Sequence, residues 1–151
     1  MIPKRARLGA ILIAAVYLAS VLLTHLPNLA WISDISQRTV LFEPLTIGCA
    51  ALILAGFDRT ATVARILIGL SMIVFGIDHF EILQFIANLI PKWMPGAYFL
   101  AAFTGAAFIA AGACIVIRWQ MPLAAGMLGL MFFLWVVLLH GPRVAGNPTQ
   151  K

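Results

Sequence analysis

Long apolar segments alternate with short polar stretches along the chain, and this pattern predicts helices that cross a membrane. Such a helix needs about 20 predominantly apolar residues, and segments of that order recur along the sequence. The short alternating segments typical of an outer-membrane β-barrel are absent. We therefore expect an all-α, polytopic bundle. Its membrane helices, about five in number, are expected at about residues 8–26, 41–57, 62–81, 97–117 and 122–140.

Proline and polar residues mark the ends of these segments. Pro27 ends the first segment, which is longer than the apolar part of a signal peptide, so we expect it to be retained as a helix. Glu43-Pro44 predicts the start of the second, because proline is tolerated in the first turn of a helix. ILQFIANLI, about residues 82–90, predicts a short interfacial helix after the third segment. The elements together form a single membrane domain over residues 1–151.

Composition agrees with a membrane protein and argues against nucleic-acid binding. The chain is 63% hydrophobic and 10% charged, whereas about a quarter of the residues in a soluble domain are charged. The net charge is +5, but the basic residues flank the apolar segments, as topology signals do, and form no stripe. We expect the lipid bilayer as the surroundings of the chain and no nucleic acid as a partner.

The basic residues also predict the orientation. Threading five helices places more of them on the side of the N-terminus, and the positive-inside rule puts that side in the cytoplasm. We therefore expect a cytoplasmic N-terminus and an outer C-terminus. The cytoplasmic side carries Lys4, Arg5, Arg7, Arg59, Arg65 and Arg118, and the outer side carries Arg38, Lys92, Arg143 and Lys151.

This orientation gathers polar side chains at the outer end of the bundle. Asp78, His79 and Glu81 lie in FGIDHFEILQF, and ionisable groups so close to lipid are costly and suggest a functional site. His140 and Arg143 reach the same end from the fifth segment. These five residues are our candidates for a quinone or ligand pocket. The same end also receives His25 and Glu43.

The cluster allows several kinds of chemistry. A quinone head group needs hydrogen-bond donors and a group that passes protons, which His79 with Asp78 or Glu81, opposed by His140 and Arg143, would supply. The alternative is a salt-bridge set that joins Asp78 or Glu81 to Arg143. Neutral imidazoles also ligate metals and haem, so His79 and His140 are candidate metal ligands, although no HxxxH or CxxC spacing accompanies them.

Small residues in the fourth segment predict close helix packing. Gly105, Ala106, Ala110 and Gly112 belong to this set. Small side chains at such spacings let the backbones of two membrane helices approach each other. We expect this packing within the protomer, with packing against a partner as the alternative.

From about residue 62 onward the chain resembles the DoxX-like family of small bacterial membrane proteins. The resemblance is carried by RILIGLSMIVFGIDHF, IPKWMPG, TGAAFIAAG and the ending LHGPRVAGNP. It implies a four-helix core, the bacterial inner (plasma) membrane and a link to quinone-dependent respiratory or sulfur-oxidising complexes. Members often carry a glutamate where this chain has Phe108. Only three helices follow residue 62, so either the first two helices complete the core or a partner or longer form supplies another.

We therefore expect an accessory or quinone-associated component of a membrane redox system, without independent catalytic activity. A non-catalytic structural subunit of a larger membrane complex is one alternative, and a bundle that binds lipid or another small hydrophobe is a second. The expected partner is another membrane protein chain or a second copy of this one.

Overall fold

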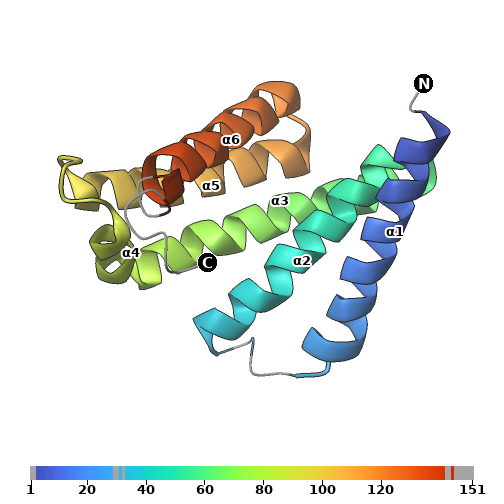
Figure 1. The fold of residues 1–151 in the computed structure, drawn as a ribbon, viewed down its shortest axis with the longest axis horizontal. Coiled ribbons are helices and arrows are strands. Elements are labelled where there is room, and N and C mark those ends of the chain that lie inside the picture. The colour runs from blue at the N-terminus through green and yellow to red at the C-terminus, as the bar shows by residue number, and fades with distance from the viewer. Residues whose placement is uncertain (1–2, 29–30, 32, 142–143, 145–151) are drawn as a thin grey trace.

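A computed structural model describes residues 3–28, 31, 33–141 and 144, with His140 described by its backbone alone. These described residues form helices and connecting turns, without strands (Figure 1). Two π-helical segments, η1 and η3, continue α1 and α6. The elements in chain order are α1 (Lys4–Ser20), η1 (Val21–His25), α2 (Ile35–Leu54), α3 (Asp58–Glu81), α4 (Leu83–Leu89), α5 (Ala97–Ile117), α6 (Met121–Trp135) and η3 (Val136–His140).

Five helical stretches are long and apolar enough to cross a membrane. They are Lys4–His25, Ile35–Leu54, Asp58–Glu81, Ala97–Ile117 and Met121–Leu139. Each reaches about 30 Å at the rise of an α-helix, which matches the hydrocarbon thickness of a bilayer. The all-α class and the five membrane-length helices expected from the sequence are thus confirmed, and they indicate a multi-pass membrane protein.

The longest helix, α3, lies at the centre of the molecule (Figure 1). It packs against α2 on one side and most extensively against α5 on the other, while α1 packs on α2 and α6 on α5. The short helix α4 packs against α5. Because successive long helices run in opposite directions, the N-terminus of α1 lies at the same end as the start of α3 (Figure 1).

We call this end the basic end, because it holds the six basic residues that the sequence predicted for the cytoplasmic side, which are Lys4, Arg5, Arg7, Arg59, Arg65 and Arg118. Arg65 of α3 donates hydrogen bonds to the carbonyl oxygens of Ile115 and Val116, the latter at 2.6 Å. Carbonyls in the last turn of a helix lack intrahelical donors and carry partial negative charge, so a guanidinium stabilises them. Arg7 lies over the ring of Phe57, 5.9 Å from its centroid.

The α3–α5 interface depends on two pairs of facing glycines. A Cβ placed on Gly76 would lie 2.6 Å from the carbonyl oxygen of Gly105, and one on Gly112 would lie 2.5 Å from that of Gly69. No side chain fits at such distances, so the backbones of the two helices approach each other at both levels. The close contact is the kind that small residues allow between membrane helices.

Two other small residues of α5 lie elsewhere. Ala106 and Ala110 are exposed, on a different side of the helix from Gly105 and Gly112. Of the four residues that the sequence proposed for helix packing, the two glycines therefore contact α3, and the two alanines face outward.

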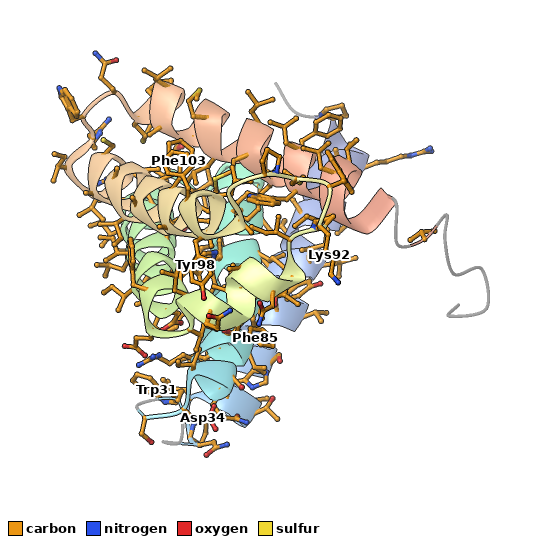
Figure 2. All side chains as sticks on the ribbon, turned by 90° about the vertical axis from the view of Figure 1, so that its left-hand side faces the viewer. Trp31, Asp34, Phe85, Lys92, Tyr98 and Phe103 are labelled. Carbon is orange, nitrogen blue, oxygen red and sulfur yellow. The ribbon has the colours of Figure 1, made fainter. Side chains whose placement is uncertain are left out.

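Helix α2 begins at Ile35, earlier than the start near Leu41 expected from the sequence. Asp34 caps it, because its carboxylate accepts hydrogen bonds from the backbone N–H groups of Ser36 (2.7 Å) and Gln37 (3.2 Å). These N–H groups have no partner within the helix, and aspartate is among the best residues for satisfying them. Asp34 and Trp31 lie at the lower tip of the molecule in Figure 2, where the chain enters α2.

The earlier start changes the position of two residues. Glu43 and Pro44 lie inside α2 and do not mark its beginning. Arg38, which the sequence assigned to a loop, is part of the same helix. We call the end of the bundle that holds Arg38, Asp78 and Glu81 the acidic end.

Candidate functional site

An ion-pair cluster joins α2 to α3 at the acidic end. Asp78 and Glu81 are three residues apart, so they lie on one face of α3. Nη2 of Arg38 lies 2.8 Å from Oδ1 of Asp78 and 2.5 Å from Oε2 of Glu81. One guanidinium therefore bridges both carboxylates.

The two carboxylates differ in their surroundings. Asp78 is 4% exposed, and neither of its carboxylate oxygens meets hydrogen-bond geometry with a described residue, so its contact with Arg38 is an ion pair alone. Glu81 is exposed and accepts a true hydrogen bond from Arg38. Removing the partner of a buried charge is costly. The buried charge of Asp78 thus depends on Arg38.

His79 points away from this cluster, toward α5. Consecutive residues of a helix differ by about 100° in direction, which separates its side chain from that of Asp78. Its Nδ1 lies 2.8 Å from the carbonyl oxygen of Phe75. A carbonyl only accepts hydrogen bonds, so Nδ1 carries the proton and donates it. The neutral ring then keeps a lone pair on Nε2, which has no hydrogen-bond partner in the described part of the chain.

The aromatic ring beside His79 is Phe108 of α5. The two ring centroids are 5.1 Å apart, with an edge-to-face angle of 63°. Phe108 is buried, and its ring also lies 5.5 Å from that of Phe132 on α6. It belongs to the packed cluster that includes Leu128 of α6. Phe108 therefore connects His79 to the α5–α6 pair.

A cavity of about 280 Å³ lies between α5 and α6. Its walls are almost entirely apolar. The hydroxyl of Thr104, one of its lining groups, donates to the carbonyl oxygen of Leu100 at 2.8 Å, so it is already used. Such a cavity suits a hydrocarbon chain. Residues that line it include Phe103, Thr104, Ala107, Leu128, Met131 and Trp135.

The structure does not describe the side chains of two of the five predicted pocket residues. Arg143 and the side chain of His140 are not among the described residues, so their expected contacts with Asp78, His79 and Glu81 stay predictions. Among the described residues, the basic partner of both acids is Arg38. The sequence did not predict this pairing, because Arg38 was expected in a loop before the second membrane helix, whereas it lies in α2. Asp34, a helix cap four residues earlier, was the signal that identifies the true start.

The structure describes only one of the two proposed metal-ligand side chains, that of His79. Within the described residues, no group of three or more His, Cys, Asp or Glu side chains is arranged to hold a metal ion. Because the side chain of His140 is outside that set, ligation by His79 and His140 stays a prediction.

The candidate site thus combines an imidazole whose Nε2 has no partner among the described residues, an ion pair with a buried carboxylate, and an apolar cavity between α5 and α6. Comparisons with family models, curated proteins and solved structures find no match to this chain. The function is therefore argued from the site itself.

Proposed function

We propose that this chain is a quinone-associated component of a membrane redox system, and that His79 binds the quinone head group. The observation that carries the proposal is the position of His79. Its ring is half-buried and packs against Phe108 of α5, its Nδ1 is fixed by the carbonyl of Phe75, and its Nε2 has no hydrogen-bond partner among the described residues. The apolar cavity between α5 and α6 offers room for part of the isoprenoid tail.

The imidazole suits both protonation states of a quinone. In its neutral form, Nε2 accepts a hydrogen bond from a quinol hydroxyl, and in its protonated form it donates one to a quinone oxygen. Imidazole is the side chain that changes charge near neutral pH, so it can hold the proton that moves with the electrons. The electrons themselves come from another component of the redox system, which makes a partner chain part of the proposal.

In this proposal, Phe108 controls the access of the quinone head group to His79 and of the isoprenoid tail to the α5–α6 cavity. The Phe108 ring contacts the His79 ring of α3 and the Phe132 ring of α6. It also packs in one cluster with Leu128, which lines the cavity. In this proposal the Phe108 ring turns aside, so that the head group reaches His79 while the tail enters the cavity. Rotation of one aromatic side chain is a small change compared with separating two helices.

Membership of the DoxX-like family is part of the same proposal. Two of the motifs that carry the resemblance meet in the structure: Gly69 and Gly76 of RILIGLSMIVFGIDHF face Gly112 and Gly105 of TGAAFIAAG. This contact supports treating them as one packing unit. The proposal includes the bacterial inner membrane, a cytoplasmic basic end and an interfacial position for α4.

Quinone retention through purification tests the proposal. The protein is extracted in mild detergent, and bound quinone is recovered with organic solvent and measured by its absorption. We expect quinone to copurify with the wild type and to fall severalfold in His79→Ala, because a hydrogen-bonding group has been removed. Gln84→Ala is the control, since Gln84 is an exposed amide of α4 that bonds to Asn88. Equal retention in wild type and His79→Ala contradicts a quinone site at this position.

A structural subunit is the second candidate function, and one observation favours it. Arg38 already forms ion pairs with Asp78 and Glu81 within the chain, as it would in a purely structural cluster. In that case His79→Ala leaves the small-molecule content unchanged and reduces the copurification of a partner protein. A bundle that binds lipid in the α5–α6 cavity predicts instead that lipid, and no quinone, is recovered with the wild type.

A further inference from the structure

A second hollow in the molecule lies between α1 and α2. Figure 1 shows these helices close together at the basic end and farther apart toward the acidic end. Between them lies a groove of about 510 Å³, within the range of small-molecule sites. Its lining residues include Tyr17, Ser20, His25, Val40, Glu43 and Pro44.

Glu43 places an exposed carboxylate on the wall of this groove. It lies eight residues after Ile35, the first residue of α2, which is about 12 Å along the axis at the rise of an α-helix. Glu43 therefore lies inside the membrane-length stretch Ile35–Leu54, about two turns from its start. An ionisable group inside a membrane-spanning helix is expensive and marks a functional site by default.

The other four acids of the chain have structural roles that Glu43 lacks. Asp34 caps α2, Asp58 lies in the first turn of α3, and Asp78 and Glu81 are paired with Arg38. Glu43 forms no ion pair with any described residue, and its side chain is exposed on the groove side of α2. The nearest base on the same helix, Arg38, is already bound to two acids. Among the described residues the carboxylate therefore has no fixed counter-charge, and the His25 imidazole is the base that lines the same groove.

The rest of the groove supplies an aromatic ring and irregular backbone. Tyr17 lines the α1 wall, and the face of such a ring attracts cations. The π-helical turn η1 carries His25 into the groove, and π-helical turns are frequent at functional sites. Pro44 has no N–H group to give to the carbonyl oxygen of Val40, one turn earlier, which loses its usual donor.

We propose that this groove binds a lipophilic organic cation. The positive centre of the ligand is paired with the Glu43 carboxylate and lies against the ring of Tyr17, and its apolar groups lie along the helix walls. A carboxylate, an aromatic face and apolar surroundings together favour this chemical class. An anionic or zwitterionic lipid head group is disfavoured, because its phosphate would lie beside the Glu43 carboxylate. The site is separate from the quinone site and does not rest on it.

Binding of tetraphenylphosphonium to the purified full-length protein in a neutral detergent tests the proposal. Calorimetry or equilibrium dialysis gives the Kd, and tetraphenylborate, which has the same shape and the opposite charge, is the ligand control. We expect the wild type to bind the cation and to bind tetraphenylborate far more weakly. Glu43→Gln keeps the side-chain size and should raise the Kd for the cation about tenfold or more, since it removes the counter-charge.

Two further variants separate charge from shape. Glu43→Asp keeps the carboxylate and should retain cation binding, whereas Asp58→Asn removes an exposed acid outside the groove and should leave the Kd unchanged. Tyr17→Phe should bind like the wild type because the ring remains. Tyr17→Leu should bind severalfold more weakly. Circular dichroism and gel filtration confirm that each variant is folded before its Kd is compared.

Three results overturn the proposal. The first is an equal Kd for the cation in wild type and a folded Glu43→Gln. The second is equal affinity for tetraphenylphosphonium and tetraphenylborate, which would make the groove a non-selective apolar surface. The third is a loss of cation binding in Asp58→Asn as large as that in Glu43→Gln. It would show that cation binding depends on the net charge of the protein and not on a site at Glu43.

Discussion

Arg38 balances the negative charges of the two carboxylates at the acidic end of the bundle. It lies on α2, and its guanidinium is the described cation within ion-pair distance of both Asp78 and Glu81. Asp78 is almost fully buried, and its oxygens have no hydrogen-bond donor in the described part of the chain to replace Arg38. Arg38 therefore compensates the buried charge of Asp78 and links α2 to α3 at this end.

Arg38→Ala should destabilise the protein by roughly 3–5 kcal/mol, because it leaves an uncompensated charge in the interior. Thermal or SDS-induced unfolding in detergent measures this loss. Lys92→Ala, an exposed base in the loop before α5, is the control and should change stability by less than about 0.5 kcal/mol. Combining Arg38→Ala with Asp78→Asn should restore part of the loss. Additive effects of the two changes would show that the ion pair carries no coupling.

At the scale of the elements, close contact between α3 and α5 organises the fold. Gly69, Gly76, Gly105 and Gly112 face each other in two pairs, and α2 and α6 pack on the outer sides of this core. Repeated small residues predicted close packing from the sequence. Their partner helix could not be predicted, because spacing within one helix does not identify the surface it meets. Only the structure distinguishes the two packed glycines from the exposed Ala106 and Ala110.

Gly76→Ala should separate α3 from α5, because the new methyl group would meet the backbone carbonyl of Gly105. Such overpacking typically costs about 1–3 kcal/mol, and unfolding in detergent measures it. Gly126→Ala on α6 is the matched control, since no atom lies within 4 Å of a Cβ placed there. It should be neutral or slightly stabilising, as alanine favours a helix over glycine. Equal destabilisation by both changes would contradict the packing account.

At the scale of the whole molecule, the number and order of the membrane helices could be predicted from the sequence, because each long apolar run has a single stable form in a bilayer. The start of α2 could not, because Glu43-Pro44 resembles a helix start and the Asp34 cap lies in a polar stretch. That Asp78 and Glu81 belong to a polar cluster could be predicted, because charged side chains near lipid are costly unless they are paired. Its partner, Arg38, and the ring of Phe108 beside His79 depend on which helices touch.

The orientation of the molecule is a prediction at this same scale. Cysteine at position 92, in a background with Cys49→Ala and Cys114→Ala, should react with an impermeant thiol reagent in intact cells, since Lys92 is exposed at the acidic end. Cysteine at position 59, at the start of α3, should react only after permeabilisation. The positive-inside rule is the reason for both expectations. The reverse pattern would invert the orientation and place the His79 site near the cytoplasm.

The central claim, a quinone site at His79, is tested most directly by a photoreactive quinone that labels the residues around its head group. Mass spectrometry of the labelled protein in lipid nanodiscs locates the label. The account predicts labelling of α3 near His79 and of α5 near Phe108, with severalfold less label in His79→Ala and competition by unlabelled quinone. Labelling confined to the α1–α2 pair, or labelling that neither His79→Ala nor competing quinone reduces, would contradict it.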